Sequence, residues 1–113
     1  MNEYLFSYGT LQKVKVQKEL FARILKGSKD ILRGYKTAFI EIEDKAFLSK
    51  GEQKYQLTAI ASQNKNDSIE GTVFELSKEE LLLTDQYEPD GYQRVNIELA
   101  SGKRAWMYAF NHN

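Results

Sequence analysis

Short runs of apolar and aromatic residues, separated by glycines and polar turns, constrain the fold of this chain more than any other feature. Six runs have the length and composition of strands, at 3–8, 31–42, 57–63, 69–76, 92–100 and 103–110. Two other segments are typical of helices: 13–26, with apolar residues at helical spacing, and 77–87, which opens with a capping box. The order β-α-β-β-β-α-β-β predicts an α+β fold with two short helices and a small, mixed, barrel-like sheet.

Glycine and proline mark the expected boundaries of these elements. Gly27 follows the first helical pattern and is expected to end that helix, and Pro89 is expected to prevent the second helix from continuing. Gly34 is expected to bend the strand that contains it. Gly71 indicates either a bulge or the close approach of another backbone. The polar segment 44–56 is expected to contain a loop or a small hairpin.

Length and composition limit the class of protein. With 113 residues, we expect a single domain over 1–113. Sixteen basic and sixteen acidic side chains cancel, so we expect no nucleic-acid partner. Cysteine is absent and the one histidine, His112, is expected to be a solvated terminal residue, so we expect no metal site. Without an apolar run of membrane-spanning length or a signal pattern, we expect no membrane partner and a cytoplasmic location.

The segment Tyr8-Gly9-Thr10-Leu11 is the first candidate for a functional site. Here a predicted strand meets a glycine turn just before a predicted helix. Such a turn can direct several backbone amides toward one carboxylate or carbonyl oxygen. In the alternative interpretation, Gly9 only permits the chain to reverse. The sequence leaves both interpretations open.

Glu88 is the second candidate, because it follows the second predicted helix and has Tyr87, Pro89 and Tyr92 around it. A carboxylate among aromatic rings has a raised pKa, since desolvation disfavours its charged form, and this suits proton transfer near neutral pH. The alternative is a solvated carboxylate at a helix end. Arg94 shares a strand face with Tyr92. It either pairs with Glu88, holds a substrate carboxylate or faces water.

Several blocks, in order along nearly the whole chain, match a known family. They include Phe6-Ser7-Tyr8-Gly9-Thr10-Leu11-Gln12, Glu70-Gly71-Thr72-Val73-Phe74-Glu75-Leu76, Asp85-Gln86-Tyr87-Glu88, Tyr92-Gln93-Arg94-Val95 and Ala105-Trp106-Met107-Tyr108. In these blocks the chain resembles the small, single-domain bacterial members of the γ-glutamylcyclotransferase-like family. The Tyr-Gly-Thr-Leu and Asp-x-Tyr-Glu motifs are specific as a pair.

The resemblance implies a small mixed barrel with a cavity at one end, and an enzyme that needs neither metal nor cofactor. Its small-molecule substrate would be a γ-glutamyl amide or γ-glutamyl-amino acid, converted into 5-oxoproline and a free amine. Glu88 would be the catalytic acid/base. The expected substrate-binding residues are Tyr8, Gly9, Thr10, Leu11, Tyr92 and Arg94.

Two alternatives to this function stay open. One is a non-catalytic homologue that binds a γ-glutamyl or carboxylate metabolite. The other is a cyclotransferase acting on γ-glutamylamines of the γ-glutamyl-ε-lysine type. Neither the leaving amine nor the oligomeric state follows from the sequence.

Overall fold

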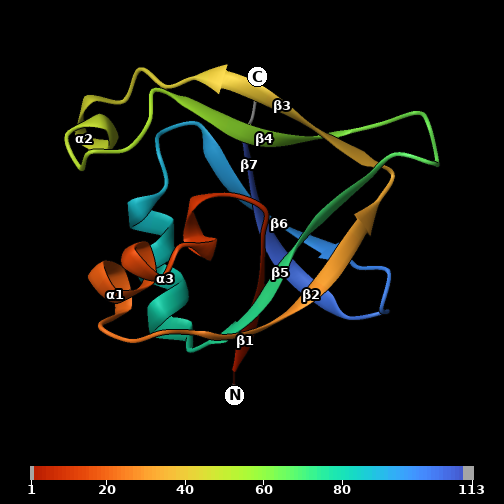
Figure 1. Ribbon diagram of the computed structural model, residues 1–113, viewed down its shortest axis with the longest axis horizontal. Coiled ribbons are helices and arrows are strands. Elements are labelled where there is room, and N and C mark those ends of the chain that lie inside the picture. The colour runs from red at the N-terminus through yellow and green to blue at the C-terminus, as the bar shows by residue number, and fades with distance from the viewer. Residues whose placement is uncertain (1, 111–113) are drawn as a thin grey trace.

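The computed structural model describes residues 2–110, which form seven strands, three α-helices and a 3-10 helix at Thr10–Gln12. In chain order the other elements are β1 (Glu3–Ser7), α1 (Val14–Phe21), β2 (Lys26–Arg33), β3 (Tyr35–Glu41), α2 (Lys45–Leu48), β4 (Tyr55–Ala61), β5 (Ser68–Leu76), α3 (Lys78–Tyr87), β6 (Tyr92–Glu98) and β7 (Arg104–Phe110) (Figure 1). None of the described helices has the length and apolarity that a membrane span requires. His112 lies outside the described residues.

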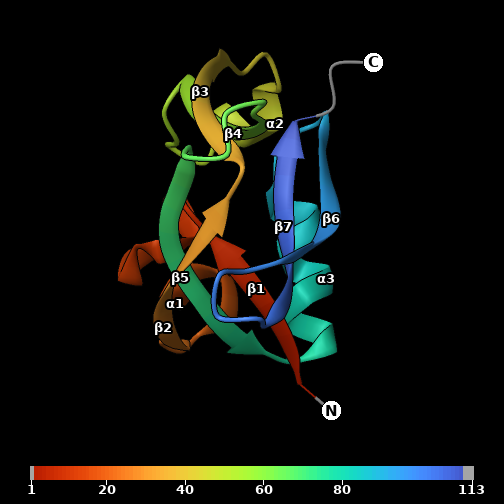
Figure 2. The same ribbon diagram turned by 90° about the vertical axis from the view of Figure 1, so that its right-hand side faces the viewer.

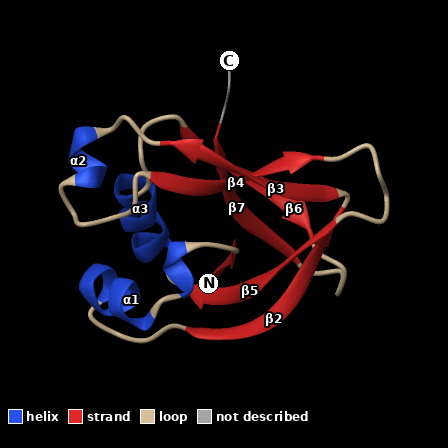
Figure 3. Ribbon diagram, turned by 45° about the horizontal axis from the view of Figure 1, so that its top comes forward, coloured by secondary structure: helices blue, strands red, loops and turns tan. Residues whose placement is uncertain are grey.

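The strands form two sheets. The larger has the order β2-β5-β1-β7-β6. Its neighbouring strands pair antiparallel, except β1 and β7, which pair parallel. Strands β3 and β4 form a separate antiparallel pair, which lies at one end of the larger sheet (Figure 2). The helices gather on one side of the molecule (Figure 3). The predicted α+β class with a mixed sheet is confirmed, although the larger sheet has two open edges and is not a closed barrel.

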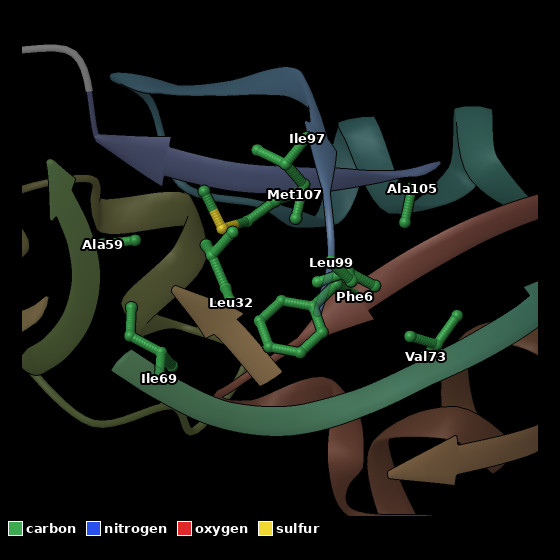
Figure 4. Close-up of a cluster of buried hydrophobic side chains, with 9 residues drawn as sticks. All are labelled: Phe6, Leu32, Ala59, Ile69, Val73, Ile97, Leu99, Ala105 and Met107. Carbon is green, nitrogen blue, oxygen red and sulfur yellow. The ribbon is translucent and has the colours of Figure 1, made fainter. Parts of the chain in front are cut away.

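Strand β1 is central to the fold because both of its faces are buried. Phe6 packs in one apolar cluster with Val73 of β5 and Met107 of β7 (Figure 4). Leu5, the preceding residue, points the other way and packs in a second cluster with Leu81 of α3. Adjacent strand residues point to opposite faces, so β1 is held from both sides. This packing fixes the position from which the loop after β1 departs.

The predicted end of the first helix, at residue 26, is wrong. The observed helix α1 ends at Phe21, and Ala22 follows in the left-handed conformation with φ of 58°. Strand β2 then begins at Lys26. Gly27 therefore lies in a strand and does not cap a helix. A Cβ at Gly27 would come within 2.7 Å of the Phe74 ring, so this glycine is explained by packing.

Two further boundaries differ from the prediction. The single strand expected at 31–42 is two strands in different sheets, because Gly34, with φ of +81°, turns the chain from β2 into β3. The segment 44–56 contains a third helix, α2, whose N-terminus is capped by the Asp44 side chain. At Gly71 the close approach is confirmed, since a Cβ there would lie 2.5 Å from the Ser7 carbonyl oxygen.

Candidate active site

A cavity of about 240 Å³ lies where the end of β1, the end of α3 and the β3–β4 pair meet. Its inner part is formed by buried side chains such as Phe6, Leu11 and Tyr108. Its rim carries Phe39 and Tyr55, which are largely exposed. The cavity therefore has a closed apolar end and an open end with aromatic side chains. The other residues that line it are Leu5, Ser7, Tyr8, Gly9, Thr10, Lys13, Phe47, Gln53, Gln56, Leu57, Glu88, Pro89 and Tyr92.

Part of the cavity wall is backbone, at the turn where β1 leads into the 3-10 helix. A Cβ at Gly9 would meet no heavy atom within 4 Å, so packing does not demand glycine there. Because Gly9 has no side chain, it lines the cavity with its backbone. The first amides of a helix have no acceptor within that helix. The amides of Thr10 and Leu11 are in this position, and both residues line the cavity.

Gln17, a buried residue of α1, holds this turn in place. Its Nε2 donates to the Leu11 carbonyl oxygen at 2.8 Å, and its Oε1 accepts from the Leu25 amide at 2.9 Å. One side chain thus connects the 3-10 helix with the chain that enters β2. The position of the backbone wall depends on this connection.

Glu88 is the residue immediately after α3, and its extended backbone conformation carries the chain away from the helix axis. It lines the cavity, and within residues 2–110 no hydrogen bond or ion pair engages its carboxyl group. Burial raises the pKa of Glu88 to about 8, and Lys50 carries the positive charge that opposes this rise. The negative charges of Glu52 and Asp85 raise the pKa further. Near neutral pH this carboxyl group can both accept and release a proton.

Tyr8 and Tyr92 also line the cavity, but their hydroxyl groups bind backbone. The Tyr8 hydroxyl donates to the Tyr108 carbonyl oxygen at 2.7 Å and accepts from the Ala59 amide at 3.0 Å. The Tyr92 hydroxyl donates to the Leu57 carbonyl oxygen at 2.8 Å. Burial raises the pKa of Tyr8 to about 12, so this hydroxyl stays protonated. These bonds join the β3–β4 pair to the larger sheet, and the two rings form the cavity wall between them.

Arg94 does not line the cavity. Its guanidinium pairs with Asp85, with Nε 3.1 Å from Oδ1, and lies 4.4 Å from the centroid of the Trp106 ring. Asp85 also accepts a hydrogen bond from the Tyr108 hydroxyl. Of the three interpretations of Arg94, an ion pair is therefore the one observed, but the partner is Asp85 and not Glu88.

The sequence alone does not place several residues near the site. Phe39 and Tyr55 come from β3 and β4, and Lys50 and Glu52 from the segment between α2 and β4. The polarity of 44–56 suggested a loop, and only its place in the fold brings it to the cavity. The one sequence signal for Phe39 is that it is an aromatic residue in the predicted strand 31–42.

These observations define a class of protein: a small α+β fold in which one carboxyl group with a raised pKa shares a cavity with a glycine turn. Similar folds occur in solved structures. A protein from Arabidopsis thaliana is 19% identical with a TM-score of 0.71, over 97% of this chain and 62% of that one. A protein named gamma-glutamyl cyclotransferase is 17% identical with a TM-score of 0.73, over 98% of this chain and 68% of that one.

YkqA from Bacillus subtilis is 23% identical with a TM-score of 0.67, over 98% of this chain and 36% of that one. At these identities the likeness shows the fold alone. No curated protein gives a significant match. The family model described as Gamma-glutamyl cyclotransferase, AIG2-like, matches residues 5–113, and the chain belongs to that family.

Proposed function

We propose that this protein is a cyclotransferase that converts a γ-glutamyl amide or γ-glutamyl-amino acid into 5-oxoproline and a free amine. The observation that carries the proposal is Glu88, a carboxyl group with a pKa of about 8 and no partner among residues 2–110, in a cavity of a size suited to a γ-glutamyl group. Membership of the family supports the same reaction.

The reaction joins two atoms of the same substrate. The α-amine nitrogen attacks the γ-carbonyl carbon, a new C–N bond closes the five-membered ring, and the C–N bond to the leaving amine breaks. The α-ammonium group first loses one proton to solvent. As the resulting amine attacks, Glu88 takes a second proton from the same nitrogen and then gives it to the leaving nitrogen. The ring nitrogen ends as an amide N–H and the leaving group as a neutral amine, and the protein supplies no nucleophile.

The remaining residues bind and orient the substrate. The amides of Thr10 and Leu11 donate to the oxyanion that forms at the γ-carbonyl, or to the substrate α-carboxylate. Tyr8, Gly9 and Tyr92 form the wall that keeps the substrate folded, so that amine and carbonyl meet. Arg94 does not reach this wall, and we assign it to hold Asp85 near the site.

The experiment that tests the function measures 5-oxoproline by mass spectrometry with γ-glutamyl dipeptides, γ-glutamyl alkylamides and γ-glutamyl-ε-lysine. Glu88→Gln keeps the shape of the side chain but cannot transfer a proton, and is expected to lower kcat by about 100-fold or more. The matched control is Glu79→Gln, which changes an exposed carboxylate at the other end of the same helix.

Turnover that survives in folded Glu88→Gln protein would show that the acid/base has been assigned wrongly. Substrate binding without any 5-oxoproline would favour the non-catalytic alternative. Turnover confined to γ-glutamyl-ε-lysine would favour the γ-glutamylamine alternative.

A further inference from the structure

Two aromatic side chains at the rim of the cavity are exposed to water. Phe39 of β3 is 71% exposed and Tyr55 of β4 is 59% exposed. Among the large hydrophobic residues of 2–110, these two are the most exposed. Apolar surface left in water raises the free energy of the folded protein, and an exposed apolar patch often marks a binding surface.

The register of the β3–β4 pair directs both side chains to the cavity. Phe39 pairs with Leu57, and Tyr55 lies two residues before Leu57 on the same strand. Side chains two residues apart in a strand, and those paired across a ladder, share a face. All three residues line the cavity. Gln56 lines the cavity between Tyr55 and Leu57, whereas Ile60, further along β4, does not line it.

The size of the cavity determines what reaches this rim. At about 240 Å³ it is smaller than the roughly 300–1,000 Å³ typical of sites for drug-sized ligands. A γ-glutamyl group held beside Glu88 leaves little room for anything larger than the amide itself. The substituent on the leaving nitrogen must therefore extend toward the open end, where Phe39 and Tyr55 lie.

The charges around the cavity indicate which substituents fit. Among the described lining residues only Lys13 and Glu88 are charged, and the rim is completed by Gln53 and Gln56. Among the described residues, no carboxylate other than Glu88 lines the cavity. Glu41 pairs with Lys54 at 2.7 Å, and Glu52, whose charge raises the pKa of Glu88, precedes the lining residue Gln53 without lining the cavity itself. An apolar substituent would instead remove aromatic surface from water.

We propose that Phe39 and Tyr55 form the subsite for the leaving amine and select amines with an apolar, above all aromatic, substituent. The subsite rests on the proposed function, because it assumes that a γ-glutamyl amide occupies the cavity. Its contacts exist equally in the bound substrate and in the transition state. They therefore lower KM and leave kcat unchanged.

The test compares three substrates that differ only in the leaving amine: γ-glutamyl-2-phenylethylamide, γ-glutamyl-methylamide and γ-glutamyl-2-aminoethylamide, which is cationic. We expect kcat/KM for the phenylethylamide to exceed that for the other two by about tenfold, through KM. Phe39→Ala and Tyr55→Ala should each reduce this ratio. Ile60→Ala, which trims an apolar side chain of β4 away from the cavity, should leave the ratio unchanged.

Calorimetry can test the subsite without turnover, by measuring how tightly Glu88→Gln protein binds the same three amides. Tighter binding of the phenylethylamide, lost in the double variants with Phe39→Ala or Tyr55→Ala, supports the subsite even if no 5-oxoproline forms and the function is wrong. Equal binding of all three amides overturns the subsite, even where turnover establishes the function. One further result would overturn the subsite. If the wild-type protein sediments as a dimer, and Phe39→Ala protein sediments as a monomer but still prefers the phenylethylamide, this face is a contact between two copies.

Discussion

At the scale of single residues, burial raises the pKa of Glu88, and two groups of opposite charge on one segment adjust it. The Lys50 ammonium lies 4.9 Å from the ring centroid of Tyr87, the residue before Glu88, and donates to the Tyr87 carbonyl oxygen at 3.2 Å. Lys50 lowers the pKa of Glu88, and Glu52, two residues further on, raises it. The segment after α2 therefore adjusts how readily the carboxyl group takes up a proton.

Replacing either group should move the pH dependence of turnover, and in opposite directions. If Glu88 acts as a base, kcat/KM rises with pH through its pKa of about 8. Lys50→Gln removes the charge that lowers this pKa and should shift the midpoint to higher pH, whereas Glu52→Gln should shift it to lower pH. The measurement is kcat/KM from pH 5.5 to 9.5 with one γ-glutamyl amide.

The substrate ammonium group ionises in the same range, but equally for every variant. Lys54→Gln is the control, because Lys54 pairs with Glu41 and does not affect the Glu88 pKa. If Lys50→Gln and Glu52→Gln shift the midpoint of the pH profile in the same direction, or leave it unchanged, the rise of kcat/KM with pH does not report the ionisation of Glu88.

Residues with local signals were predictable, and those that depend on tertiary position were not. Glu88 and the Gly9 turn stand at the ends of regular elements, where the sequence pattern changes. Phe39 reaches the cavity only because β3 pairs with β4, which also lines the cavity. Arg94 does share a strand with Tyr92, but two residues along a strand span about 6.6 Å, which is enough to carry Arg94 past a cavity of this size.

At the scale of elements, pairing with β5 overrides the helical pattern after Phe21. The apolar spacing that predicted the first helix included Ile24, which is exposed, whereas β2 takes the chain from Lys26 and pairs along β5. Local propensity is a weak guide where a sheet offers partners. The capping box at Ser77 is formed, and α3 begins where the sequence predicts, because that signal is complete within four residues.

Gln17 connects two elements, and its replacement should destabilise the fold. It is 1% exposed, and Gln17→Leu leaves the Leu11 carbonyl and the Leu25 amide without their buried partner. Each unsatisfied group costs about 1–3 kcal/mol, so the free energy of unfolding should fall by about 3 kcal/mol. The measurement is urea unfolding followed by circular dichroism.

Lys18→Leu is the matched control for this change, because it introduces the same side chain at the neighbouring, exposed position of α1. It should change the free energy of unfolding by about 0.5 kcal/mol or less. An equal free energy of unfolding for Gln17→Leu and the wild-type protein would contradict the role assigned to the Gln17 bonds.

At the scale of the whole molecule, the cavity lies at the junction of the two sheets. Tyr8 and Tyr92 bind backbone of β4, and the Phe110 amide donates to the buried Thr58 hydroxyl at 2.8 Å. These polar contacts supplement an apolar contact, through Ala59 of β4 and Tyr35 of β3, between the β3–β4 pair and the core. The shape of the cavity is therefore determined by how the β3–β4 pair packs against the larger sheet. The sequence pattern of either sheet alone does not predict this shape.

Holding Glu88 in this junction should lower the stability of the protein near neutral pH. Its pKa is about 8 in the folded protein against 4.5 for an ordinary glutamate, so between these values the folded state binds more protons than the unfolded state. The free energy of unfolding must then fall as pH rises through this window. Glutamine does not titrate, so Glu88→Gln should be more stable than wild type, by little at pH 5 and by roughly 3 kcal/mol at pH 7.

Urea unfolding of both proteins at pH 5, 6, 7 and 8 measures this difference, with Glu79→Gln as the control whose offset from wild type should stay constant. A difference between Glu88→Gln and wild type that does not grow with pH would show that Glu88 is not buried as an ionisable group. If the difference grows with pH and Glu88→Gln protein has also lost turnover, the same carboxyl group both destabilises the fold and performs the chemistry. That combination is expected where a site retains a titratable group in a desolvated position for function.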